Sequence, residues 1–169
     1  MSLALVQSRA LLGLRAPPVT VEVHLANGLP SFTLVGLAEV EVKEARERVR
    51  SALQNAGLEF PHNKRITVNL APADLPKDSG RFDLPIALGI LAASGQIDAA
   101  RLAGWEFAGE LSLSGELRAV RGADGLPTHY VGMFSDISRE KQDQARLDYL
   151  THHDPLTGFA NRQLFMERL

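Results

Sequence analysis

The residues best suited to chemistry lie in one polar loop, between a predicted strand and a predicted buried helix. The loop carries five charged side chains: Asp74, Lys77, Asp78, Arg81 and Asp83. The apolar run 84–93 follows it directly. Loops held by a rigid scaffold often carry functional residues. A cluster of charged residues in a loop is, however, more commonly just a solvent-exposed surface. We take this loop as the candidate site.

A serine and a lysine in the loop raise the question of a Ser–Lys peptidase. Such an enzyme needs a serine nucleophile that a lysine activates. Ser79 and Lys77 are two positions apart on the loop, which is typical of turn residues rather than of a catalytic dyad. We expect no peptidase activity from this pair.

Motifs for nucleotide hydrolysis and for metal binding are missing. A P-loop needs G-x-x-x-x-G-K-[ST], because backbone amides cradle the phosphates while the lysine reaches the outer ones. No Gly-Lys pair occurs in the sequence. His152, His153 and Asp154 are adjacent, and adjacent helical residues point about 100° apart, so they seldom bind one ion. We expect no metal site, no cofactor and no ATP hydrolysis in this chain.

The composition is that of an ordinary soluble protein. The 169 residues suffice for one domain with a core, or one domain with an appendage. Hydrophobic residues make up 45% and the net charge is −2, so nothing in the totals indicates nucleic acid or an anionic membrane. There is no cysteine, no signal-peptide pattern and no apolar run of the ~20 residues that span a bilayer. We expect a cytoplasmic protein without a membrane partner.

Alternating apolar residues predict several strands before the loop. Residues 3–14 suggest a first strand with Leu3, Leu5 and Leu11 on one side, and residues 19–26 a second. Asn27-Gly28 predicts a two-residue hairpin into a short strand at 32–35. Residues 66–70 predict the strand that enters the loop, which Pro72 and Pro76 end. His24 lies on a polar strand face and is not expected to bind metal.

The helical patterns are equally regular. Residues 39–56 predict a helix, ended by Gly57, with the apolar stripe Val42, Ala45, Val49, Ala52, Leu53 and Ala56. Its pairs Glu39–Lys43 and Glu44–Arg48 are expected on the solvent side. Arg46, Arg48 and Arg50 are interpreted as a solvated face rather than a nucleic-acid patch. Residues 84–93 predict a buried helix, and residues 105–113 and 117–120 two strands joined around Ser114-Gly115. The pattern indicates an α+β fold with a mixed or antiparallel sheet.

Four segments of residues 1–123 resemble a known domain. They are TVEVHLANGLPSFTLVGL, VKEARERVRSALQNAG, ITVNLAPADLPKDSGRFDLPIALGILAASGQI and GELSLSGELRAVRGA. Together they resemble the amino-terminal domain of the ComM-class Mg-chelatase-related AAA+ ATPases. The resemblance implies a fold of the ribosomal S5 domain 2 type, shared with the proteolytic domain of Lon. In that class the domain precedes a hexameric ATPase associated with DNA branch migration during natural transformation.

The resemblance also bears on the loop. Against the Lon pattern, the nucleophile position falls at about Asp83, and a carboxylate there cannot be acylated usefully. The partner lysine would lie just beyond Gly122, where no lysine follows until Lys141. We therefore expect a non-catalytic accessory domain that contacts a protein partner or a second copy. Asp74, Lys77, Arg81 and Asp83 are the predicted contact residues. ATP and Mg²⁺ would belong to the motor, and DNA would be reached only through it.

The sequence after Ala123 resembles a different class. THYVGMFSDISREKQ is similar to the last strand of a PAS sensor domain, and LDYLTHHDPLTGFANRQLFMERL to the opening of a GGDEF diguanylate cyclase domain. Asp154, Leu156, Thr157, Gly158, Asn161 and Arg162 match D-x-L-T-G-L-x-N-R, while Phe159 replaces a leucine. In that family the asparagine matched by Asn161 contacts the guanine base. The GGDEF signature itself is absent, so no cyclase activity is expected.

These observations predict three segments. Residues 1–123 form the truncated Lon-like domain, residues 124–138 a PAS-like strand, and residues 139–169 a signalling helix, expected over 139–152, with an incomplete GGDEF start. The junction at 123/124 is natural, engineered or that of a hypothetical reading frame, and the sequence leaves these open. The alternative functions are a fragment of a PAS–GGDEF cyclic-di-GMP signalling protein and, with less support, a Lon-like serine peptidase.

Overall fold

The computed structural model describes residues 2–36, 38, 40–78, 80–118 and 135–136. The chain divides into two units, Met1–Ser135 and Asp136–Leu169. The predicted helix at 139–152, together with Asn161, lies outside the described residues. Of the strand expected in the PAS-like segment, only β8 (Ser135–Asp136) is described. All other described helices and strands belong to the first unit.

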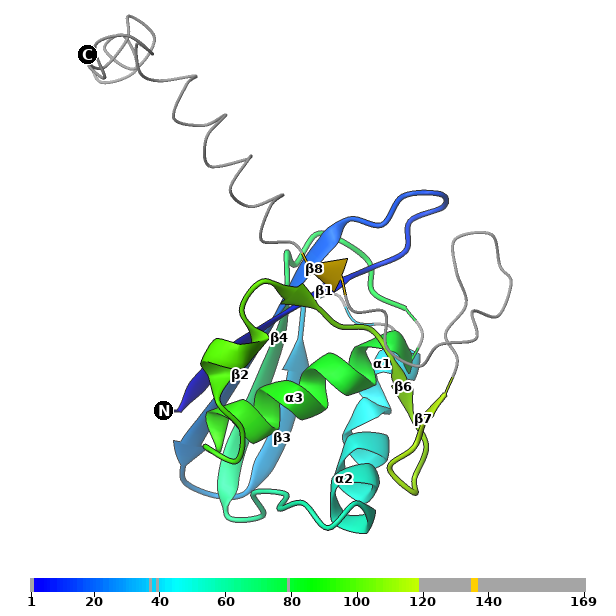
Figure 1. Cartoon of the computed structure of the whole chain (residues 1–169). Helices are drawn as coiled ribbons and strands as arrows, with labels where there is room; N and C mark the ends of the chain where they lie inside the picture. Colours follow the sequence, from blue (N-terminus) through cyan, green and yellow to red (C-terminus); the bar gives the residue numbers. More distant parts are fainter. Residues whose placement is uncertain (1, 37, 39, 79, 119–134, 137–169) are drawn as a thin grey trace, which may run out of the picture. The chain divides into compact units, whose positions relative to one another are not determined.

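A mixed sheet forms the centre of the first unit (Figure 1). Its strands are β1 (Leu3–Arg9), β2 (Pro18–Asn27), β3 (Ser31–Val35), β4 (Lys64–Ala71) and β5 (Trp105–Glu106), in the order β3-β4-β2-β1-β5. The pairs β1–β2 and β2–β4 are antiparallel, whereas β3–β4 and β1–β5 are parallel. A mixed sheet with few helices is compatible with the predicted α+β class.

The predicted hairpin at Asn27-Gly28 is wrong. The next strand, β3, pairs in parallel with β4, which lies between β2 and β3 in the sheet. Val23 of β2 therefore neighbours Val68 of β4, which in turn neighbours Leu34 of β3. A parallel pair needs a crossover connection, and the two helices that follow β3 supply it.

The crossover contains α1 (Val40–Lys43) and α2 (Ala45–Asn55) instead of one helix over 39–56. Val42, Ala45, Val49, Ala52 and Leu53 of the predicted stripe are buried, whereas Ala56 is exposed. Gly57 ends α2 as predicted: its φ is +76°, and the N–H groups of Gly57 and Leu58 donate to the carbonyls of Gln54 and Leu53. The left-handed conformation favours glycine at this position.

The second long helix, α3 (Asp83–Ala93), follows a single 3-10 turn, η1 (Gly80–Phe82). It is apolar on nearly all sides and packs on β1 and β2. At Gly89 an added Cβ would lie 2.4 Å from Cγ2 of Val23. Glycine therefore permits the close approach of helix and sheet, and the predicted buried helix is confirmed.

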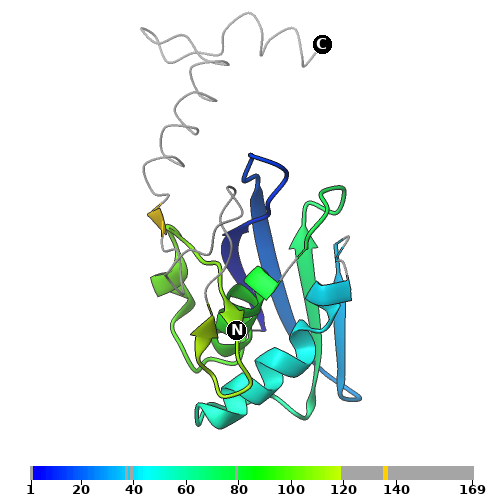
Figure 2. The same cartoon turned by 90° about the vertical axis from the view of Figure 1, so that its right-hand side faces the viewer.

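Of the described elements, the helices α2 and α3 cover one face of the sheet and none covers the other, as the two views show (Figures 1 and 2). The first strand was expected over residues 3–14, but β1 ends at Arg9. Ala4, Val6 and Ser8 point inward, while Leu3 and Leu5 are 45% and 54% exposed. Because α3 packs closely on the inner side of β1, smaller side chains occupy that side and the leucines face outward.

The predicted strand at 105–113 is divided. Its first part, β5, pairs in parallel with β1 through Gln7 and Glu106. Its last part, β6 (Glu110–Leu111), forms a hairpin with β7 (Leu117–Arg118), around Ser114-Gly115 as predicted. Between α3 and β5 the chain forms a short 3-10 helix, η2 (Ala99–Leu102). Within the described ranges no helix has the length and apolarity needed to cross a bilayer.

Candidate functional site

Lys77 anchors the loop that follows β4. Its side chain is fully buried, and Nζ donates hydrogen bonds to the carbonyl of Gly36, at 2.8 Å, and to that of Pro72. Burial lowers the pKa of Lys77, against the opposing charge of Asp74. The ammonium therefore ties the loop to the end of β3, where Ala38 also bridges to Lys77.

Gly36 makes this anchoring possible. Its φ is +106°, and an added Cβ would lie 2.2 Å from the carbonyl oxygen of Leu70. Only a residue without a side chain allows β3 to approach β4 so closely while turning its carbonyl toward Lys77.

Asp83 lies at the first position of α3 and is fully buried. Arg48 of α2 donates to both of its carboxylate oxygens, from Nε to Oδ2 at 2.6 Å and from Nη2 to Oδ1 at 3.1 Å. The N–H of Leu111 donates to Oδ2 at 3.2 Å. The carboxylate thus joins α2, α3 and β6, and we call Asp83, Arg48 and the Leu111 amide the Asp83 junction.

The electrostatics of the Asp83 junction follow from burial and pairing. Burial raises the pKa of Asp83, while its hydrogen bonds with Arg48 and Leu111 act in the opposite direction. The hydrogen bond to Asp83 raises the pKa of Arg48. A two-pronged bond between guanidinium and carboxylate is the strong form of this pair. A carboxylate at a helix amino terminus is also favoured by the helix dipole.

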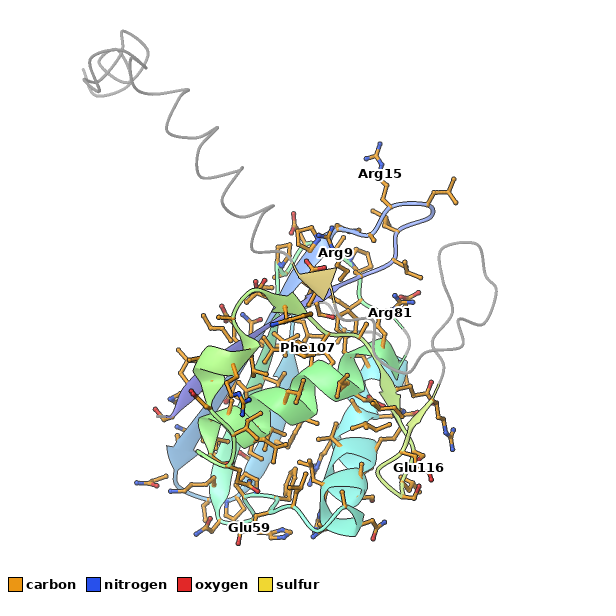
Figure 3. The ribbon with its side chains drawn as sticks, viewed as in Figure 1. Arg9, Arg15, Glu59, Arg81, Phe107 and Glu116 are labelled. Atoms are coloured by element: carbon orange, nitrogen blue, oxygen red, sulfur yellow. The ribbon has the colours of Figure 1, made fainter. Side chains whose placement is uncertain are left out.

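Arg81 belongs to a backbone connection between the loop and the segment before β6. The Gly109 N–H donates to the Arg81 carbonyl at 2.8 Å, and the Leu84 N–H to the Gly109 carbonyl at 2.9 Å. The Arg81 side chain is buried, which lowers its pKa against the charge of Asp78. It lines a small cavity of about 80 Å³ with Arg9, Glu106 and Phe107. Figure 3 labels Arg9, Arg81 and Phe107, which lie near one another.

The structure thus separates the four predicted contact residues. Lys77, Arg81 and Asp83 are buried within the chain, and only Asp74 is exposed. A buried side chain is not accessible to a second subunit. Of the four residues, only Asp74 therefore remains a predicted subunit contact. The other three hold the loop, α2, α3 and β6 together.

The contacts of Lys77 and Asp83 hold neighbouring elements together. The Asp83 carboxylate is occupied by Arg48 and cannot act as an acylated nucleophile. Ser79 lies outside the described residues. Within the described ranges no group of three His, Asp or Glu side chains could hold a metal ion, and the sequence has no Gly-Lys pair for a P-loop.

Sequence reasoning missed Arg48. It was predicted on the solvent side with Glu44, and that contact exists, at 3.6 Å. The stronger partner is Asp83, 35 residues away, and the Arg48 side chain is only 20% exposed. No local spacing rule reports a pair so distant in sequence. The indirect signal was a carboxylate at the start of an otherwise apolar helix, since a buried charge needs a partner.

Comparison with known proteins adds the family. The profile of ChlI, described as subunit ChlI of Mg-chelatase, matches residues 21–133. Competence protein ComM of Haemophilus influenzae is 67% identical over 122 residues, which are 72% of this chain and 24% of that protein. YifB of Salmonella typhimurium is 63% identical over 131 residues, 78% of this chain and 26% of that protein. YifB of Escherichia coli is 53% identical over 149 residues, 87% of this chain and 29% of that protein. The chain spans about a quarter of the length of these relatives.

Proposed function

The chain belongs to the family of ChlI, a subunit of Mg-chelatase, and from this premise we propose that it is a non-catalytic accessory domain of a ComM-class AAA+ ATPase. In this proposal its fold is of the Lon-like, S5 domain 2 type. It contacts the ATPase motor or a second copy of the domain, in the cytoplasm. ATP and Mg²⁺ bind the motor, and the motor brings the domain to DNA during branch migration.

The family match is the observation that carries this proposal. It begins within β2, extends past β7 and therefore contains Arg48, Asp83 and Leu111, the three members of the Asp83 junction. A carboxylate held by a guanidinium and a backbone amide supports a structural role at the position where the Lon pattern has its nucleophile. The absence of a Gly-Lys pair supports a role without ATP hydrolysis in this chain.

Two measurements test the proposal. The tagged chain is mixed with the separately purified ATPase part of a ComM-class relative, and co-elution from a sizing column is expected. Asp74→Arg should weaken co-elution, because it reverses the exposed charge of the predicted contact. Asp78→Arg is the matched control, since Asp78 is also exposed on the same loop.

The second measurement is of catalysis. The chain alone should release no phosphate from ATP with Mg²⁺ beyond a buffer control, and should leave casein intact. ATP turnover, casein cleavage that Ser79→Ala abolishes, or failure to co-elute would each overturn the proposed function.

Residues 124–169 carry a second candidate, favoured by the match of 154–162 to the GGDEF opening. We infer that this part is a PAS–GGDEF fragment of a cyclic-di-GMP signalling protein, joined to the first domain near Ala123. Saturable GTP binding in a calorimetric titration, lost on Asn161→Ala, is the expected result. Genomic or transcript sequencing tests the 123/124 junction. If no read crosses the junction, the join is artificial.

A further inference from the structure

A basic cavity of about 300 Å³ lies between α2, the start of β3 and the loop that leads into β4. Its charged or titratable lining residues are Arg46, Arg50, His62 and Lys64, and Phe32 and Phe60 add aromatic surface. Among the residues that the structure describes, no carboxylate lines it. The volume reaches the lower bound of ordinary ligand pockets, about 300 Å³. We call these six residues the basic cavity.

The cations of the basic cavity are weakly neutralised. Arg46 meets Glu47 at 3.4 Å, but the two side chains are 49% and 68% exposed, and exposed ion pairs contribute little. The Lys64 ammonium donates to the neutral amide oxygen of Asn27 at 2.6 Å. Within the described part of the chain, Arg50 has no ion pair. Positive charge therefore remains available to a ligand.

Two of these positive charges lie close together on α2 and repel each other. Arg46 and Arg50 are four residues apart on α2, and like charges at that spacing destabilise a helix. Arg48, between them in sequence, turns instead to Asp83. An anion bound between Arg46 and Arg50 would convert the repulsion into two attractions.

Aromatic rings border the same space. The rings of Phe60 and His62 lie 5.6 Å apart, tilted by 59°, and Gln54 holds His62 through a hydrogen bond at 3.1 Å. Phe32 and Phe60 are half-buried, so each leaves part of a ring accessible. Nucleobases stack on such rings, while Arg and Lys bind the phosphates of the same strand. Phosphate alone would need no aromatic surface.

We propose that the basic cavity binds one nucleotide unit of a single-stranded nucleic acid. The guanidinium groups of Arg46 and Arg50 and the ammonium of Lys64 donate hydrogen bonds to phosphate oxygens. The base lies against Phe60 and His62. This binding belongs to the chain itself and does not depend on an ATPase motor, so it stands or falls separately from the proposed function.

The test is fluorescence anisotropy with a labelled oligonucleotide of about 20 thymidines. Neutralisation of phosphates by three cations predicts that log affinity falls with log salt with a slope of about −2. In Arg46→Gln/Arg50→Gln the affinity should fall about ten-fold or more at about 50 mM salt, and the slope should become shallower by about 1.4.

The matched control is Arg15→Gln/Arg101→Gln, which removes the same charge from two exposed arginines outside the basic cavity. Arg15 and Glu59, the neighbour of Phe60, lie at opposite ends of the first unit (Figure 3). The control should retain affinity within about two-fold, because its arginines contact no phosphate in this proposal.

A second variant separates stacking from charge. Phe60→Leu keeps an apolar side chain against the core but removes the ring, so affinity should fall about five-fold or more with the salt slope unchanged. Circular dichroism and the urea midpoint verify that each variant is folded. This variant keeps the proposal testable if the arginine variants do not fold.

Five results would overturn the proposal. Four of them are no anisotropy change with the unaltered chain, an equal loss in the matched control, full affinity in Phe60→Leu, and equal binding of a polyglutamate peptide. Competition by dTMP or ATP at the same nucleotide concentration would assign the cavity to a free nucleotide and so overturn its assignment to a strand.

Discussion

Arg48 and Arg50 lie two residues apart on α2, and they belong to regions of opposite character. In the Asp83 junction, every charge has a partner from another element: Arg48 pairs with Asp83, which also accepts from the Leu111 amide. In the basic cavity, Arg50 lies among other cations, and no carboxylate of the described residues lines the cavity wall. One helix therefore contributes to a satisfied interior site and to an unsatisfied surface site.

This difference separates stability from binding. Residues two apart on a helix do not share a face, so a run of arginines cannot be assigned one role. A paired and buried charge holds elements together, because removal of one partner leaves the other desolvated. Charges that repel one another at a surface contribute nothing to the fold and remain available to a ligand. Substitutions should therefore act on different measurements in the two regions.

The largest effect is expected from Asp83→Ala in the Asp83 junction. It leaves the guanidinium of Arg48 half-enclosed without its carboxylate and the Leu111 amide without an acceptor. The free energy of unfolding should fall by about 3–5 kcal/mol, measured by urea denaturation. Asp78→Ala, on the exposed part of the same loop, should change it by less than about 0.5 kcal/mol. Equal effects would break the distinction between paired and surface charges.

A pH effect of intermediate size is expected from Lys77. Burial lowers its pKa in the folded chain below the ordinary value of 10.5. The unfolded chain then holds the proton to a higher pH, so the contribution of Lys77 to stability rises as pH rises from the folded-state pKa toward 10.5. Below the folded-state pKa this contribution is constant and at its lowest.

The measurement is the difference in unfolding free energy between the unaltered chain and Lys77→Met, followed from about pH 7.5 to about 10.5. It should rise by about 1.4 kcal/mol for each pH unit by which the pKa is lowered. Lys43→Met, which removes a lysine at an exposed position of α1, is the matched control. A flat difference for Lys77→Met would show that its burial does not act on the ammonium.

The smallest effect on stability is expected in the basic cavity. Arg46→Gln/Arg50→Gln removes a like-charge pair four residues apart, so the free energy of unfolding should stay equal or rise by about 0.2–0.5 kcal/mol. Urea denaturation of this variant beside Asp83→Ala gives the comparison directly. A loss above about 1 kcal/mol would show that these arginines support the fold, and would remove the contrast with Arg48.

The sequence predicts the local parts of this fold and fails where distant segments meet. The alternation of β2 and β4 and the stripe of α2 report which residues face the core, because each period follows from backbone geometry. The parallel pairing of β3 with β4 carries no local signal, and Asn27-Gly28 suggested a hairpin instead. The inward face of β1 depends on α3, whose close packing selects Ala4 and Val6 over Leu3 and Leu5.

The candidate loop shows the same limit. Its charged residues are visible in the sequence, but their burial is not. Lys77 is buried because Gly36 and Pro72 present carbonyls to its ammonium, and Asp83 because Arg48 reaches it from another helix. Both partners come from folding rather than spacing. The basic cavity was likewise hidden, since Lys64 and Arg46, 18 positions apart in the sequence, come to line one cavity only in the folded chain.

The position of β4 between β2 and β3 also sets an order for synthesis on the ribosome. β4 pairs with eight residues of β2 and with five of β3, yet it is the last of the first four strands to be made. Of the strand pairs in this sheet, residues 1–63 can form only β1–β2, and isolated two-stranded hairpins are marginal in water. β3 stays without a neighbour until residues 64–71 leave the exit tunnel, and the sheet then assembles around the newest strand.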